Sequence, residues 1–215
     1  MVQLRPTADV VYPESDGQPI ADNTVQFEWI VALKQNLDRL TLPDTDIFVA
    51  GDLFWYPVEG RADICVAPDV LVAIGRPKGK RGSYQQWRED GIAPQVVFEI
   101  ISPSNTAQEM AGKVRFFQTY GVQEYYVYDP EKNTLDVWQR ENDRLVGGSA
   151  PPESISPLLG VRFVRSPETL TLYHPDGREF TSYQDELERA DQERDRADKL
   201  AAKLRELGVD PDALT

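Results

Sequence analysis

One short run restricts the fold of this chain more than any other: Val96–Ile101, in which five apolar residues surround Glu99. An apolar run of this length, bounded by turn-forming and polar residues, predicts a strand that is buried on both faces. Burying a carboxylate without a counter-charge or a metal is strongly unfavourable. The fold is therefore expected to bring a cation to Glu99.

A second acid has a similar setting, because Asp69 follows Pro68 and opens the apolar run Val70–Ile74. Carboxylates and backbone carbonyls are the oxygen ligands that Mg²⁺ and Mn²⁺ prefer in proteins. Two acids on buried strands therefore predict a divalent metal site, with Mg²⁺ as the expected ion and Mn²⁺ as the alternative. The predicted ligands are Asp69, Glu99 and the carbonyl oxygen of Ile100, with Glu28 as a further candidate.

Composition excludes several other chemistries. A single cysteine, Cys65, and a single histidine, His174, cannot build a structural zinc site or a disulfide framework. The same scarcity argues against Cys/His and Ser/His/Asp catalysis, so Ser102 and Ser104 are interpreted as turn and capping residues. Any catalysis is expected to depend on carboxylates, lysine and a metal ion.

The net charge of −13 argues against a general nucleic-acid-binding protein. However, the segment 76–88 contains five basic residues and no acid. Lys78, Lys80 and Arg81 of this segment are candidate phosphate-binding residues. A solvated loop without a ligand is the alternative interpretation.

Hydrophobic periodicity predicts a mixed α/β domain. A helix is expected over 24–40, followed by short strands at 47–49, 53–56, 64–66 and 70–74, and then by the Glu99 strand. A second helix is expected from Thr106, which has capping-box spacing to Glu109, as far as Gly121. Lys113 occupies an apolar position in the stripe of this helix and is predicted to face the sheet. Strands at 124–129 and 135–139 follow.

The remaining chain is expected to hold peripheral strands at 161–164 and 170–173 and, from residue 184, a highly charged helix. Its apolar residues are spaced alternately by three and four positions, except where Arg194 interrupts them: Leu187, Ala190, Ala197, Ala201 and Leu204. This pattern predicts a weak coiled-coil seam and a homodimer. The predicted domains are 1–183 and 184–215. With no apolar run long enough to span a bilayer and no signal-peptide pattern at the start, the expected location is the cytoplasm.

Several segments resemble the Uma-type putative endonuclease family of the PD-(D/E)XK nuclease superfamily: Pro68–Val70, Arg81–Tyr84 with Trp87, Pro94–Asn105, Lys113 and Tyr120–Pro130. The resemblance covers roughly residues 10 to 180. It implies a restriction endonuclease-like αβββαβ core with a mixed sheet, peripheral β-hairpins and a charged C-terminal helix. It also implies Mg²⁺-dependent cleavage of DNA, with Asp69 and Glu99 as metal ligands and Lys113 as the catalytic lysine.

One departure from the superfamily pattern concerns the position two residues after Glu99, where Ile101 replaces the usual lysine. In the family that the chain resembles, a helix lysine takes this role, and Lys113 is its counterpart. The alternative function is a non-catalytic binding or assembly module that keeps the fold. In that interpretation Asp69 caps a turn, and Lys113 forms a structural ion pair with Glu99 or Glu109.

Overall fold

The computed structural model describes residues 10–207 except 16 and 18. Contacts divide the chain into two compact units, Met1–Phe180 and Thr181–Thr215. Among the described residues, no helix combines the length and the apolar character needed to cross a membrane.

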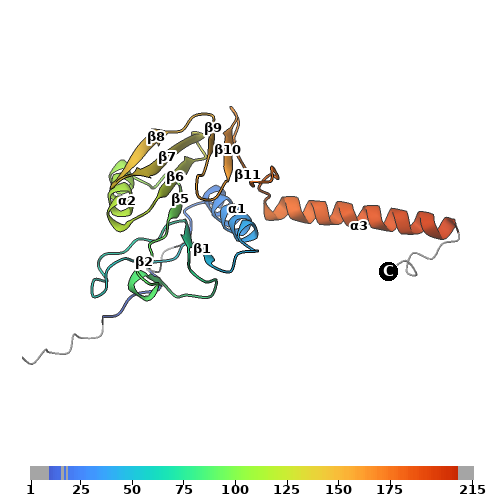
Figure 1. The fold of residues 1–215 in the computed structure, drawn as a ribbon. Helices are drawn as coiled ribbons and strands as arrows, with labels where there is room; N and C mark the ends of the chain where they lie inside the picture. Colours follow the sequence, from blue (N-terminus) through green and yellow to red (C-terminus); the bar gives the residue numbers. More distant parts are fainter. Residues whose placement is uncertain (1–9, 16, 18, 208–215) are drawn as a thin grey trace, which may run out of the picture. The chain divides into compact units, whose positions relative to one another are not determined.

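The first unit is built on a six-stranded sheet with the order β1-β3-β5-β6-β7-β8 (Figure 1). Its strands are β1 (Ile47–Gly51), β3 (Val70–Ile74), β5 (Val96–Ile100), β6 (Glu124–Asp129), β7 (Thr134–Glu141) and β8 (Arg144–Ser149). Two helices accompany the sheet, α1 (Thr24–Leu40) and α2 (Ala107–Tyr120). The other elements are β2 (Trp55–Tyr56), β4 (Tyr84–Gln85), the 3₁₀-helix η1 (Gln86–Arg88), β9 (Glu153–Ile155), β10 (Arg162–Arg165) and β11 (Leu170–Tyr173). The second unit contains α3 (Tyr183–Glu206).

The central elements follow the order α1, β1, β3, β5, α2, β6. Strands β1, β3 and β5 are antiparallel neighbours, whereas β5 and β6 are parallel. A parallel pair needs a crossover connection, and α2 supplies it. This is the predicted restriction endonuclease-like αβββαβ core with a mixed sheet, and the predicted fold class is confirmed.

Each face of the sheet has its own apolar core. On one face Ile30, Leu33 and Leu37 of α1 pack with alternate strand residues, and buried residues of β10 and β11 complete the cluster. On the other face Phe117 of α2 packs against Val97 and Tyr125. Strand residues therefore alternate between α1 and α2, which is why these central strands read as continuous apolar runs.

Several local predictions were wrong. Residues 64–66 form only an isolated bridge, between Val66 and Trp55, and β8 was not predicted. The strands near 161–173 form a separate, peripheral three-stranded sheet with β9, as expected, and their apolar residues pack in the core beside α1. The place of His174 next to the turn at Pro175 predicts a surface residue, but His174 is only 4% exposed and packs against Phe180.

Candidate active site

Strand register places three acids in one row at the ends of β1, β3 and β5. Val70 pairs with Phe98 in the antiparallel β3–β5 ladder, so the next step of this ladder sets Asp69 opposite Glu99. Gly51 pairs with Val70, which brings Asp52 opposite Asp69 in the same way. The backbone N–H of Asp52 donates to the carbonyl oxygen of Asp69 at 3.1 Å. The sequence predicted two of these acids and missed Asp52.

Helix α2 carries Lys113 to this row. The helix begins with a capping box between Thr106 and Glu109 and ends at Gly121, which adopts the left-handed conformation. Both features were predicted, and they set the position of the helix along the sheet. Lys113 Nζ donates to Glu99 Oε2 at 2.5 Å. The structure therefore brings Asp69, Glu99 and Lys113 together, and Glu109 is engaged in the helix cap instead of pairing with Lys113.

The two carboxylates are bound differently. The Asp69 Oδ2 atom accepts a hydrogen bond of 2.6 Å from the N–H of Ile100. The Glu99 side chain is 4% exposed, and its Oε1 atom is buried without a hydrogen-bond partner among the described residues. Buried polar atoms normally have a partner, because an unsatisfied one is costly. The orphaned oxygen beside a second carboxylate is an acceptor suited to a cation.

Gln26 is a site residue that the sequence reasoning missed. It is buried on α1, and its Nε2 donates to the carbonyl oxygen of Ile100 at 3.0 Å. A hydrogen bond from Gln26 also lowers the pKa of Asp69, against the larger effect of burial. Glu28, the further candidate ligand on this helix, is exposed. A buried polar residue within the predicted helix was the only available signal, because the helix phase relative to the sheet is not readable from sequence.

Burial dominates the electrostatics of the row. It raises the pKa of Asp69 to about 6. It raises the pKa of Glu99 to about 8, although the positive charge of Lys113 opposes this shift. Burial alone would lower the pKa of Lys113, but the charge and hydrogen bond of Glu99 raise it. Asp69, Glu99 and Lys113 therefore bind protons more tightly than isolated side chains of the same types would. A bound metal ion would supply the positive charge that these protons provide.

These residues fit a divalent ion with an incomplete protein ligand set. Among the described residues, no three Asp, Glu, His or Cys side chains come together as a ready-made metal cage. Mg²⁺ commonly uses one or two carboxylates and keeps several waters, so Asp69 and Glu99 are sufficient protein ligands for it. The Ile100 carbonyl accepts one hydrogen bond from Gln26 and keeps one lone pair for a third ligand.

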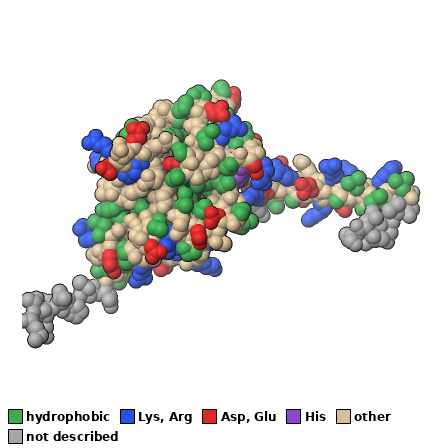
Figure 2. Space-filling model, viewed as in Figure 1, with side chains coloured by type: hydrophobic (Ala, Val, Ile, Leu, Met, Phe, Trp, Pro, Cys, Tyr) green, Lys and Arg blue, Asp and Glu red, His purple; other side chains and the backbone are tan. Residues whose placement is uncertain are grey.

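The three predicted phosphate-binding residues differ in their exposure and in their contacts. Arg81 pairs with the buried Glu89 at 2.6 Å, and its guanidinium lies over the ring of Phe48. Lys78 is exposed, and its Nζ donates to Thr41 Oγ1 at 3.0 Å. Lys80 is exposed. Figure 2 shows acidic and basic side chains interspersed on the visible face of the first unit, without one broad basic surface.

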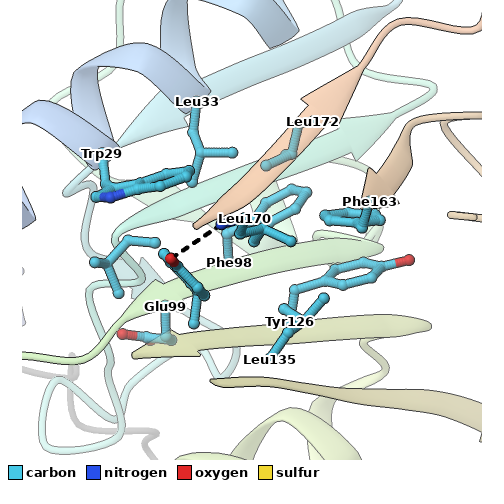
Figure 3. Close-up of a pocket in the computed structure, with 11 residues that line it drawn as sticks. Trp29, Leu33, Phe98, Glu99, Tyr126, Leu135, Phe163, Leu170 and Leu172 are labelled. Carbon is cyan, nitrogen blue, oxygen red and sulfur yellow. Dashed lines mark hydrogen bonds between the residues drawn. The ribbon is translucent and has the colours of Figure 1, made fainter. Parts of the chain in front are cut away.

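The apolar pocket on the α1 face of the sheet contributes no chemistry. Figure 3 shows Trp29 and Leu33 of α1 above the sheet, with the Glu99 side chain directed away from them. The hydrogen bond drawn there joins the N–H of Leu170 to the Tyr128 hydroxyl. Glu99 instead meets Lys113 of α2 on the opposite face of the sheet.

Comparisons with known proteins identify similar chains. A family model described as "Uma2: Putative restriction endonuclease" matches residues 12–172. Among solved structures, the chain is similar to "a putative nuclease belonging to DUF820" from Anabaena variabilis ATCC 29413, with 15% sequence identity and a TM-score of 0.47. That match covers 63% of this chain and 72% of the other. No curated protein matches the chain.

Proposed function

Because the chain belongs to the Uma2 family of putative restriction endonucleases, as its motifs predicted, we propose that it is a metal-dependent endonuclease acting on DNA. It hydrolyses phosphodiester bonds with Asp69 and Glu99 as Mg²⁺ ligands and Lys113 as the catalytic lysine. Mn²⁺ is the alternative ion, and the cytoplasm is the proposed location.

One observation carries this proposal: one oxygen of Glu99 accepts from Lys113, and the other is buried beside Asp69 without a partner in the described part of the chain. A purely structural ion pair would be expected to satisfy both oxygens, since an unsatisfied buried acceptor destabilises the fold. A cation held by Asp69 and Glu99 would give the second oxygen a partner. This favours a metal site over the non-catalytic binding or assembly module.

A divalent ion held there supplies charge neutralisation at the scissile phosphate and activation of the attacking water. Asp69 and Glu99 hold and orient this charge, and the hydrogen bond from the Ile100 N–H fixes the Asp69 carboxylate. The Lys113 ammonium lies against Glu99, and its side chain is 24% exposed; in the proposed reaction the ammonium contacts a phosphate oxygen. There it stabilises the negative charge that develops in the transition state.

The test is cleavage of supercoiled plasmid and of single-stranded DNA, with Mg²⁺, Mn²⁺ or EDTA. The variants are Glu99→Gln and Lys113→Met, which keep side-chain size while removing charge. Glu131→Gln is the matched control, because Glu131 lies exposed in the turn between β6 and β7. We expect metal-dependent cutting in the wild type and the control, and a loss of at least about 100-fold in both site variants.

Cutting that persists in Glu99→Gln and Lys113→Met would refute this assignment of the site. Absence of cutting, together with no binding of Mn²⁺ by calorimetry, would favour the binding or assembly module. Binding of Mn²⁺ that depends on Glu99, without cutting of these DNAs, would support the metal site and contradict their use as substrates.

A further inference from the structure

Within the described part of its own unit, residues 181–207, no other helix or strand packs against the apolar side chains of helix α3. It is a regular helix of 24 residues, begun by a capping box between Ser182 and Asp185. Nearly all of its described side chains are exposed, including Leu187 (48%) and Leu200 (57%). Most helical stability in proteins comes from packing of an amphipathic face. A helix of this kind is expected to pack against a partner.

The seam of α3 has continuous heptad spacing, with an arginine at one of its apolar positions. Positions alternate by three and four residues from Leu187 to Leu204, and Arg194 occupies one of them. The a positions are Leu187, Arg194 and Ala201, and the d positions are Ala190, Ala197 and Leu204. The seam therefore has large apolar residues at both ends, small residues between them and one arginine.

This seam is symmetric about its middle, which selects the orientation of a partner. In an antiparallel pair of identical helices each a residue faces a d residue. Leu187 then meets Leu204 of the second copy, Ala190 meets Ala201, and Arg194 meets Ala197. Large residues pair at both ends, small residues pair inside, and each arginine lies over a methyl group. We propose that α3 forms an antiparallel coiled coil with α3 of a second copy of this chain.

A parallel pair of the same helices would be opposed by charge. Identical positions face each other across a parallel seam, so Arg194 would meet Arg194. The flanking g and e positions would bring Glu186 against Asp191, and Glu193 against Asp198, on each side of the pair. Such like-charge contacts are a means by which coiled coils exclude the wrong orientation.

The distribution of charge along α3 favours the antiparallel arrangement over the parallel one. The half 183–194 contains five acids and two bases, whereas the half 195–206 contains three acids and four bases. An antiparallel pair sets these halves opposite each other, and Figure 2 shows both signs interspersed along the helix. One like-charge contact remains in the antiparallel pair, between Asp191 and Asp198 of the second copy, and symmetry repeats it. Arg194 lies three residues after Asp191 and four before Asp198, so it is a helix neighbour of both acids.

The first test is the dissociation constant of the full chain by sedimentation velocity, for Ala201→Asp and the matched control Ala202→Asp. Both substitutions exchange the same residues on neighbouring helix positions, but only residue 201 lies in the seam. We expect Ala201→Asp to raise the dissociation constant about 100-fold, since two carboxylates are desolvated per dimer. Ala202→Asp should change it less than about 3-fold. A monomeric wild type, or equal effects of the two substitutions, would overturn the proposal.

The second test measures orientation by disulfide formation in a Cys65→Ser background. Ala190→Cys and Ala201→Cys chains are oxidised separately and as a mixture. An antiparallel pair predicts cross-linking mainly in the mixture, because residue 190 faces residue 201 of the second copy. Cross-linking of Ala190→Cys with itself to the same extent would establish a parallel pair and contradict the proposal. Neither readout requires nuclease activity, so the outcome is independent of the proposed function.

Discussion

The pH dependence of stability tests the electrostatics of the candidate site directly. Glu99 has a pKa of about 8 in the folded protein, against an ordinary value of 4.5. Between pH 6 and 8 the folded chain retains a proton on Glu99 that the unfolded chain has lost. Stability falls with pH wherever the folded state binds more protons, by about 1.4 kcal/mol per pH unit for one proton. This residue alone should therefore reduce the free energy of unfolding by about 2 kcal/mol between pH 6 and 8 in the absence of metal.

The assay is urea unfolding followed by tryptophan fluorescence at pH 6 and 8 in EDTA. Glu99→Gln removes the titrating group while keeping its size, so its stability should change with pH by about 2 kcal/mol less than that of the wild type. The exposed Glu131→Gln variant should behave as the wild type does. The comparison uses the change with pH, because Glu99→Gln also deprives Lys113 of its partner and shifts stability at every pH.

The same unfolding measurement is repeated with Mg²⁺ in place of EDTA. A metal ion binds the ionised carboxylates, so it should stabilise the wild type more at pH 8 than at pH 6. It should have little effect on Glu99→Gln. Wild-type stability that rises from pH 6 to pH 8, or an identical pH response in Glu99→Gln, would show that Glu99 is ionised in an ordinary ion pair and would refute the reasoning.

Gln26→Ala and Arg81→Met test interactions that the sequence did not reveal, and Lys80→Met tests a predicted phosphate contact. Gln26→Ala should destabilise the fold by about 1 to 3 kcal/mol because it leaves the Ile100 carbonyl without its donor; thermal unfolding measures this, and an equal loss in the exposed control Glu28→Ala would contradict it. Arg81→Met should destabilise by about 1.5 to 3 kcal/mol, because it removes hydrogen bonds to the buried Glu89, which keeps its ion pair with Arg76. Lys80→Met should leave stability within about 0.5 kcal/mol of the wild type, but it should weaken DNA binding most at low salt. Equal DNA affinity of Lys80→Met and the wild type at low salt would exclude Lys80 as a phosphate contact.

Local sequence patterns were sufficient for much of the fold. The first helix, the strands that carry or follow the two acids, and the capped helix with Lys113 all lie where the periodicity placed them. These features depend on residues close together in the chain, such as Thr106 and Glu109 in one cap. Strand β8 escaped prediction because its glycines suggested a turn. A Cβ atom at Gly147 would meet the Val137 carbonyl oxygen of β7, so glycine is required there by the neighbouring strand.

Burial of Glu99 and its need for a positive partner follow from the local pattern alone, since an apolar run around one acid has that consequence in any fold. The identity of the groups around Glu99 depends on how distant elements pack. The strand register places Asp52 in the row of acids. The rotation of α1 about its axis directs Gln26, and not Glu28, toward the Ile100 carbonyl. Arg81 forms an ion pair with Glu89. Hydrophobic periodicity indicates which side chains are buried. Contacts between residues far apart in the sequence depend on how helices and strands pack, and this packing is a property of the whole chain.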